Sequence, residues 1–207
     1  MGAPGRYTGT MSQLPLTHMP STYAIGDLHG EVTLLRQLPG LLPLQPKDTV
    51  VFLGDYLDRG EDSSTTIATL RAFAQTHALV VFLRGNHEDA WLTSWDGVRF
   101  SRVPDMNGAR KVWEDFGGKI PVEVGQWLAG TVIEYEDEHA YYVHAGVIPG
   151  RPVWRTPGVL KLWGQGAFWR AHTTGVSQWY LGTGKCRSRC FSPTRSGLIL
   201  APTRRAF

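Results

Sequence analysis

The stretch VVFLRGNHEDAW, residues 80–91, runs from four apolar residues directly into a polar cluster. Its apolar start, which includes two β-branched valines, predicts a buried strand. The polar part begins at Arg84 and Gly85 and brings Asn86 and His87 together immediately after that strand. Ligands of α/β folds bind at the carboxyl ends of strands, so this position favours a functional site.

Strand-like and helix-like patterns alternate through the first part of the chain. Short apolar runs predict buried strands, and apolar residues at helical spacing predict helices. In chain order these are strand 22–27, helix 31–38, strand 49–55, helix 62–77, strand 78–86, helix 107–118 and a hairpin over 131–146. The β-α-β-α-β order predicts an α/β fold with a largely parallel sheet, and the hairpin predicts a second, mixed sheet packed against it.

Some of these elements carry signals for their ends. Pro39 and Gly40 are expected to stop the first helix. Asp62 or Ser63 is expected to cap the start of the second helix, because both residue types accept a hydrogen bond from the first turn. The hairpin is expected to turn near Asp137.

Each predicted strand ends at a small set of Asp, His or Asn residues beside a glycine. The sets are GDLHG at 26–30, GDYLDRG at 54–60, GNHE at 85–88 and HAG at 144–146. Glycine permits tight turns and a close approach of the backbone to a ligand. Four such sets should converge on one edge of the sheet, where carboxylate, imidazole and amide oxygen together suit Mn, Fe or Zn.

Each set taken alone has a simpler interpretation. Asp27 and His29 can be a turn aspartate and a surface histidine. Asn86 can be a helix N-cap, since asparagine is a favoured cap. His144 can be a histidine of the core. The repetition at four strand ends favours a shared metal site over these separate roles.

The residue types also predict roles within such a site. Two metal ions need a bridging ligand, and Asp55 is the candidate, since a shared carboxylate can hold two ions about 3.5–4 Å apart. Arg59 offers a bidentate grip on phosphate oxygens. His87, next to the proposed ligand Asn86, can protonate a leaving oxygen, and Asp58 can orient it and favour its charged form.

The four sets, in this order, resemble the calcineurin-like metallophosphoesterases. The resemblance is strongest to the phosphoprotein phosphatase branch, which includes bacterial members and the symmetrical diadenosine tetraphosphate hydrolases, and it covers roughly residues 21–150. It implies a four-layer αββα sandwich of two mixed β-sheets flanked by helices, with a dinuclear metal site. The two divalent ions are expected to be Mn, with Fe and Zn as alternatives.

The resemblance assigns a role to each motif residue. The first metal would be held by Asp27, His29 and Asp55, and the second by Asp55, Asn86 and His144. His87 and Asp58 would form the acid pair, and the substrate phosphate would be bound by Arg59 together with Asn86. These assignments agree with the roles expected from the residue types.

The family pattern also has a late histidine for the second metal, followed by a Gly-x-Asp-Thr-Gly stretch, and neither occurs in this chain. His172 is the only histidine after His144. It lies at the end of a predicted amphipathic helix, 162–175, which favours a surface or cap role over a ligand role. Gln165 stands where the family tends to place a second phosphate-binding arginine.

The chain is expected to form one metallophosphoesterase domain, 21–181, between a disordered leader, 1–20, and an atypical basic tail, 182–207. Read one base out of frame with GC-rich codons, the tail regains a histidine and a Leu-Asp-Thr-Gly stretch in order. We therefore interpret the tail as frameshifted, by mutation or sequencing error.

The alternative is a genuine, loosely packed tail. Such a tail would leave the second metal one ligand short and could make the chain an inactive metal- or phosphate-binding relic.

Composition limits the remaining classes of function. The two cysteines, Cys186 and Cys190, do not make a disulfide framework, so a reducing cytoplasm is expected. No apolar run approaches the roughly 18 residues that span a membrane. All 18 acidic residues lie before position 139 and ten of the 21 basic residues lie after it, but no dense Lys/Arg run supports nucleic-acid binding.

The predicted activity is therefore phosphomonoester hydrolysis by a hydroxide that two metals activate. GDYLDRG and RGNHE favour a protein Ser/Thr phosphatase acting on phosphorylated proteins; the alternative substrate is a symmetrical dinucleoside tetraphosphate. The insert at 95–118 can select the substrate. Its Trp95, Phe100 and Trp113 can stack on a nucleobase, although a role in the core is favoured.

Overall fold

The computed structural model describes residues 20–77, 79–138, 140–148, 151–164 and 201–202. The elements are β1 (Thr22–Ile25), α1 (Val32–Leu41), β2 (Thr49–Phe52), α2 (Ser63–Thr76), β3 (Leu79–Phe82), α3 (Asn86–Leu92), α4 (Ala109–Asp115), α5 (Val122–Ala129), β4 (Glu134–Glu136), β5 (Tyr141–Val143), the 3-10 helix η1 (Val153–Arg155), α6 (Gly158–Trp163) and β6 (Ala201–Pro202).

The main sheet has the strand order β3-β2-β1-β6. Its first three strands are parallel and in step, with Thr49 of β2 opposite both Thr22 of β1 and Leu79 of β3. The short β6 pairs with β1 in the antiparallel sense. The prediction of an α/β fold with a parallel sheet is thus confirmed, and the carboxyl ends of β1, β2 and β3 lie at one edge.

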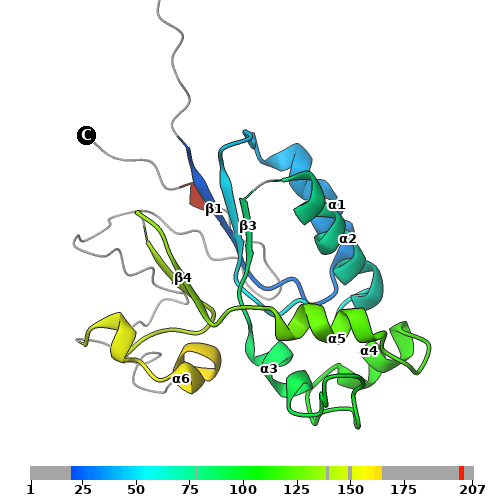
Figure 1. The fold of residues 1–207 in the computed structure, drawn as a ribbon. Helices are drawn as coiled ribbons and strands as arrows, with labels where there is room; N and C mark the ends of the chain where they lie inside the picture. The colour runs from blue at the N-terminus through cyan, green and yellow to red at the C-terminus, as the bar shows by residue number, and fades with distance from the viewer. Residues whose placement is uncertain (1–19, 78, 139, 149–150, 165–200, 203–207) are drawn as a thin grey trace, which may run out of the picture.

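The two faces of this sheet are covered differently (Figure 1). Val50 and Phe52 of β2 pack toward α1 and α2, where Leu70 belongs to the same buried cluster. Val51, which points the other way, packs with Tyr142 of the hairpin formed by β4 and β5. Alternation along the strand therefore places a helix layer on one face and the predicted hairpin on the other.

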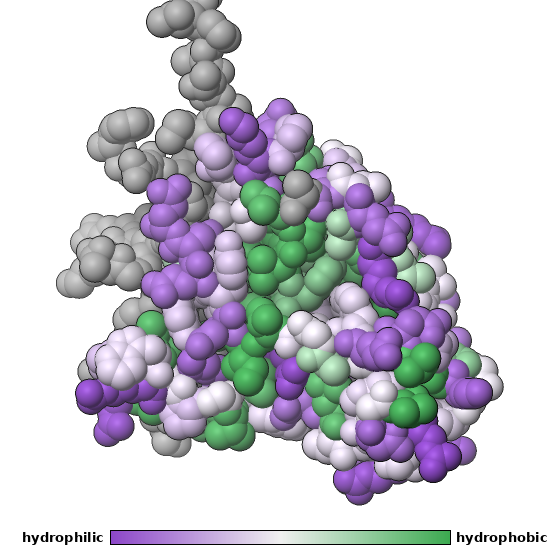
Figure 2. All heavy atoms as spheres, viewed as in Figure 1, coloured by the Kyte–Doolittle hydropathy of each residue, from purple (hydrophilic) through white to green (hydrophobic). Residues whose placement is uncertain are grey.

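β3 is less buried than its sequence predicts. Among the described strands it lies at the edge of the sheet, and Leu79 is 49% exposed. An apolar strip of surface runs over this strand in Figure 2. The apolar run identifies the strand correctly, but it does not show whether a strand is central or at an edge.

The first helix does not stop at Pro39 as expected. α1 continues to Leu41, and the amide of Leu42 closes its last turn by donating to the carbonyl of Leu38 at 3.1 Å. Leu38 is fully buried in the core. Proline removes only one backbone donor, so packing of the last turn outweighs the stop signal here.

The second helix begins as predicted, with Asp62 as its cap: the carboxylate accepts from the amide of Thr65 at 2.9 Å. α5 was not predicted, because valine and glycine are weak helix formers. Gly125 of α5 packs so closely on Trp95 that a Cβ would lie 2.3 Å from the Trp95 ring. Tertiary packing thus decides this helix.

The predicted helix 162–175 is only partly described. α6 ends at Trp163, and Gly164 caps it with a φ of 70°. The rest of that segment, including Gln165 and His172, lies outside the described residues, as do both cysteines and most of the tail. No helix among the described residues is long and apolar enough to cross a membrane.

Candidate metal centre

The predicted ligands come from loops that follow four strands. Asp27 and His29 follow β1, Asp55 follows β2, Asn86 begins α3 after β3, and His144 follows β5. The first two loops are tied together, because the amides of Leu28 and His29 both donate to the carbonyl of Asp55, at 3.0 and 2.8 Å. The common edge of the parallel strands therefore brings these side chains together.

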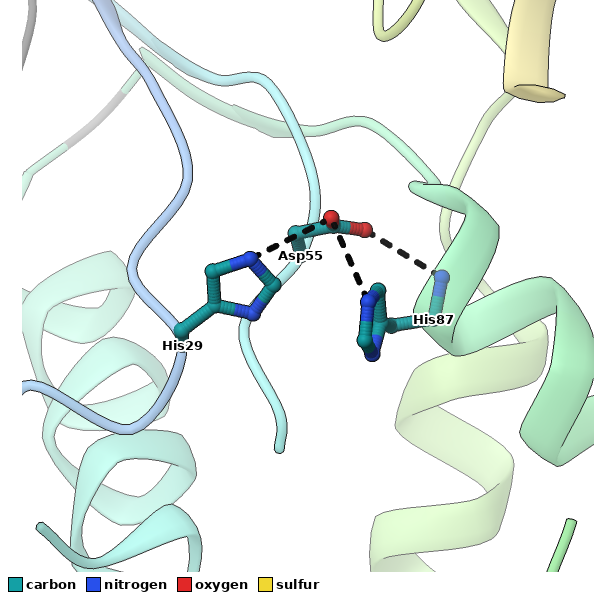
Figure 3. Close-up of side chains that lie close together, drawn as sticks. All are labelled: His29, Asp55 and His87. Atoms are coloured by element: carbon teal, nitrogen blue, oxygen red, sulfur yellow. Dashed lines mark hydrogen bonds and ion pairs between the residues drawn. The ribbon is translucent and has the colours of Figure 1, made fainter. Parts of the chain in front are cut away.

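Asp55 lies at the middle of the cluster. On one side its Oδ2 atom lies 3.5 Å from Nε2 of His29 and 3.9 Å from Nε2 of His87 (Figure 3). On the other side its Oδ1 atom lies 3.5 Å from Nε2 of His144. The side chain of Asp55 is only 5% exposed. A single carboxylate thus faces imidazole nitrogens from both sides.

Asp27 and Asn86 complete the surroundings of Asp55. The two Asp27 oxygens lie 3.9 Å from ring nitrogens of His29 and His144, and its carboxylate is about half exposed. Oδ1 of Asn86 lies 2.9 Å from Nε2 of His144. Loss of water around Asp27 and the charge of Asp55 raise the pKa of Asp27.

Among the described residues, two groups of side chains could hold a metal ion: His29, Asp55 and His87, and Asp27, Asp55 and His144. The histidines are oriented for this. Nδ1 of His29 lies 3.0 Å from the carbonyl of Leu57, and Nδ1 of His144 lies 2.9 Å from that of Leu53. Because a carbonyl can only accept, each Nδ1 carries the proton and each Nε2 presents its lone pair to the centre, as metal-ligating histidines do.

This orientation leaves Nε2 of His144 and Oδ1 of Asn86 as two acceptors 2.9 Å apart. A divalent cation bound by both would stabilise that contact. Carboxylate, imidazole and amide oxygen are together a donor set for Mn, Fe or Zn. The residues present therefore fit the expected metal ions.

The simpler interpretations of the motif residues do not match these positions. His29 is not a surface histidine, since its side chain is only 14% exposed and its ring is tied to Leu57. Asn86 is not the N-cap of α3; Gly85 holds that position and Asn86 is the first helical residue. His144 faces the cluster rather than the apolar core.

The expected acid pair is buried beside the cluster. Nδ1 of His87 makes a short contact with Oδ2 of Asp58, and Nε1 of Trp91 donates to Oδ1 of Asp58 at 3.2 Å. Burial alone would lower the pKa of His87, but the hydrogen bond with Asp58 and the charges of Asp55 and Asp58 outweigh it and raise the pKa. Asp58 is therefore placed to orient His87 and to favour its charged form.

Arg59 lies beside the buried acid pair and is itself in contact with solvent. The residue is exposed, and its Nη2 atom lies 3.0 Å from Nε2 of His87. The guanidinium is thus held within reach of the metal cluster and of solvent, where an incoming phosphate would meet it.

The loops that carry these residues have an unusual backbone. His29, Asp55, Asp58 and Arg59 have φ values of 44°, 54°, 71° and 72°. Non-glycine residues in this left-handed region cost about 1–3 kcal/mol each and cluster at functional sites. Gly108 packs directly against the backbone of Arg59, since a Cβ at Gly108 would lie 2.2 Å from the amide nitrogen of Arg59.

Sequence reasoning missed the role of Glu88. Glu88 lies in the first turn of α3, is fully buried and accepts from the amides of Asp55, Tyr56 and Gly85. Burial and the charge of Asp55 raise the pKa of Glu88 to about 7, although the backbone hydrogen bonds oppose the shift. The only signal in the sequence for these backbone contacts is that Glu88 stands three residues after a helix cap.

Arg84 and Asp89 take structural roles. The Nη2 atom of Arg84 donates to the carbonyls of Ala129 and Thr131 and so holds the end of α5 in place. Asp89, in the first turn of α3, accepts from Nε1 of Trp163 at 2.8 Å and joins α3 to α6. The contacts described for Arg84 and Asp89 are thus with other parts of the fold and not with the proposed metal ligands.

The aromatic residues of the insert belong to a core, as favoured. Phe100 is buried, and Trp95 and Trp113 pack against the same cluster. Phe100 and Trp113 also line an open cavity of about 750 Å³ together with Ile120. None of the metal-cluster residues lines that cavity.

Comparison with known proteins gives a family match. The model of the family described as calcineurin-like phosphoesterase matches residues 20–183. A symmetrical bis(5'-nucleosyl)-tetraphosphatase from Janthinobacterium sp. (strain Marseille) is 32% identical over 130 residues, 62% of this chain and 44% of that protein. A catalytic subunit of protein phosphatase 2A from Dictyostelium discoideum is 31% identical over 126 residues, 60% of this chain and 38% of that protein.

The chain therefore spans less than half the length of these curated relatives. Among solved structures, a mutant of a cold-active protein tyrosine phosphatase aligns with a TM-score of 0.51 at 17% identity. That alignment covers 75% of this chain and 53% of the other. At this identity the likeness concerns the fold.

Proposed function

The chain belongs to the calcineurin-like phosphoesterase family of hydrolases, as its four motifs predict, and on that premise we propose that it is a metal-dependent phosphatase acting on phosphomonoesters. The observation that carries the proposal is the position of Asp55. Its two oxygens face Nε2 of His29 and Nε2 of His144 at 3.5 Å each. A carboxylate placed in this way is the ligand that two neighbouring ions can share.

The proposed ligands of the first metal are Asp27, His29 and Asp55, and those of the second are Asp55, Asn86 and His144. Two bound divalent ions would supply Lewis acidity, activation of water and stabilisation of charge at phosphorus. Mn is the proposed metal, with Fe and Zn as alternatives. The donor set supports this range of metals and does not single one out.

The protein's own groups would then bind and protonate the substrate. Arg59 would hold two phosphate oxygens through its guanidinium, together with Asn86. His87 would donate the proton of its Nε2 atom to the leaving oxygen, while Asp58 holds Nδ1. Nη2 of Arg59 lies 3.0 Å from Nε2 of His87, which supports a phosphate-binding group and a proton donor side by side. Because a guanidinium can only donate, Nε2 accepts in this contact and would carry its proton once Arg59 binds phosphate instead.

We propose phosphorylated Ser/Thr on proteins as the substrate, on the strength of the GDYLDRG and RGNHE motifs and of the relative in Dictyostelium discoideum. The relative in Janthinobacterium favours symmetrical dinucleoside tetraphosphates as a second candidate. Phosphate release from a phosphoserine peptide, compared with nucleotide release from diadenosine tetraphosphate at equal enzyme concentration, separates the two.

We propose the following fold, domain bounds and location for the protein. The full fold would be the four-layer αββα sandwich, of which a helix layer, the main sheet and the hairpin are described. The domain would run over 21–181, between a leader and a tail, and the protein would act in the cytoplasm. The small number of cysteines supports the last point.

Turnover of p-nitrophenyl phosphate by the 207-residue chain tests the proposal. We expect steady hydrolysis with added Mn²⁺ and none after treatment with a chelator. No Mn²⁺-dependent turnover would favour the inactive relic instead, in which the tail is genuine and the second metal lacks a ligand. Sequencing the gene across codons 175 to 190 tests the frameshift separately.

A further inference from the structure

Glu88 is a buried carboxylate that accepts hydrogen bonds from the backbone amides on both sides of the Asp55 α-carbon. Its Oε2 atom accepts from the amides of Asp55 and Gly85 at 2.8 and 2.9 Å, and its Oε1 atom accepts from the amide of Tyr56 at 2.8 Å. The side chain is fully buried. The amides on both sides of the Asp55 α-carbon are thus held by one side chain.

Asp55 needs such a restraint because its backbone is left-handed, with a φ of 54°. A non-glycine residue in this region relaxes to a more common conformation unless its surroundings prevent it. The relaxation would swing the carboxylate out of the position between His29 and His144. The bonds to Glu88 oppose that movement directly at the backbone of residue 55.

Gly85 makes room for this arrangement. A Cβ at Gly85 would lie 2.1 Å from Oδ1 of Asp55 and 2.9 Å from Oε2 of Glu88. The amide of His87 donates to Oδ1 of Asp55 at 3.2 Å. The first turn of α3 therefore grips both the backbone and the carboxylate of Asp55.

We propose that Glu88 is a positioning residue, which fixes the left-handed backbone of Asp55 and thereby directs its carboxylate between the two groups of metal ligands. This inference rests on the proposed dinuclear centre. Glu88 itself faces backbone amides and is not assigned to either group of ligands. It acts on the metals only through Asp55, as an outer residue that orients a ligand.

Glu88→Gln tests the proposal with little change in size. An amide has only one acceptor oxygen, so either orientation leaves the amide of Asp55 or that of Tyr56 facing an NH₂ group. Asp48→Asn is the matched control. Asp48 is also a buried carboxylate that accepts from two backbone amides, those of Ser21 and Gln45, but it precedes β2 at the opposite edge of the sheet.

The readouts are Mn²⁺ binding by calorimetry and the electron paramagnetic resonance spectrum of the Mn²⁺-loaded protein. In Glu88→Gln we expect affinity for Mn²⁺ to fall about 10–100-fold, the range for residues that orient ligands. We also expect the coupled two-ion spectrum to give way to isolated Mn²⁺. Asp48→Asn should lower the melting temperature yet keep wild-type affinity and the coupled spectrum.

Two results would overturn the inference, and they can be told apart. Wild-type protein that binds fewer than two Mn²⁺ removes the proposed centre and the inference with it. Wild-type protein that binds two, together with unchanged affinity and coupling in Glu88→Gln, removes the inference alone. If Glu88→Gln does not fold, Glu88→Asp is measured instead, because its carboxylate ends one methylene short, and wild-type Mn²⁺ binding there would equally overturn the proposal.

Discussion

Asp58 contacts Nδ1 of His87 with both side chains fully closed off from solvent. The second oxygen of Asp58 accepts a hydrogen bond from the indole nitrogen of Trp91. A carboxylate fixed by two partners in this way holds the imidazole in one orientation, with Nε2 directed toward Asp55 and Arg59. The pair therefore has the geometry of a proton donor and its orienting residue.

This pair should matter most for substrates with poor leaving groups. Asp58→Asn removes the charge that favours protonated His87, so kcat for a phosphoserine peptide should fall about 10²-fold or more. p-Nitrophenolate leaves without protonation, so kcat for p-nitrophenyl phosphate should change far less. Steady-state kinetics with both substrates checks the prediction, and an equal loss on both would argue against an acid role for the pair.

His87 can be separated from the metal ligands in a similar way. Its Nε2 atom lies 3.9 Å from Asp55, close enough to count among possible ligands. We predict that His87→Asn lowers kcat for the phosphoserine peptide about 10²-fold or more while the Mn²⁺ content stays at the wild-type value. Metal analysis after gel filtration measures this, and loss of metal in parallel with activity would make His87 a ligand.

The close approach at Gly85 predicts a sharp contrast between two glycines. Gly85→Ala places a methyl group 2.1 Å from Oδ1 of Asp55, so Mn²⁺ binding and turnover should both be lost. Gly40→Ala, at a helical position with nothing within 4 Å, should leave both unchanged and raise stability by up to about 1 kcal/mol. Wild-type Mn²⁺ affinity in Gly85→Ala would show that the contact is dispensable.

Asp62 should make stability depend on pH. Burial alone would raise its pKa, but hydrogen bonds from Thr65 and Ser64 outweigh burial and lower the pKa to about 2, against 3.8 for an ordinary aspartate. The folded state thus favours the charged form. Its contribution is complete above the ordinary pKa and is lost as the pH falls toward 2.

Asp62→Ala should therefore lower stability by about 0.5–2 kcal/mol at pH 7. The difference from wild type should shrink as the pH falls from 5 to 2. Asp62→Asn, which keeps a cap but cannot titrate, is the control: its difference from Asp62→Ala should stay constant over the same pH range. Urea unfolding at several pH values measures this, and a constant difference between wild type and Asp62→Ala would contradict the assigned pKa.

The strands, the hairpin and the residues that gather at Asp55 could be predicted from the sequence. Each is encoded locally: apolar runs mark the strands, and glycine-flanked polar sets mark their carboxyl ends. Parallel strands end at one edge of a sheet, and this rule is enough to expect Asp27 and Asp55 to lie together. His144 lies far from Asp55 in the chain and follows the hairpin. The hairpin then brings in His144 from the other face.

What the sequence could not predict depends on tertiary packing. α1 continues past Pro39 because Leu38 is buried in the core. α5 forms around Gly125 because the ring of Trp95 fills the space where a side chain would be. The role of Glu88 could not be predicted, because its contacts with the amides of Asp55 and Tyr56 depend on the left-handed turn that the structure reveals.

Calorimetric titration with Mn²⁺ of the wild type and of Asp55→Asn tests most directly whether Asp55 joins two metal sites. The wild type should bind two Mn²⁺ per chain. Asp55→Asn should lose the shared ligand of both sites, bind no more than one Mn²⁺ with weakened affinity, and lose nearly all turnover. Binding of two Mn²⁺ by Asp55→Asn with wild-type affinity would contradict the account.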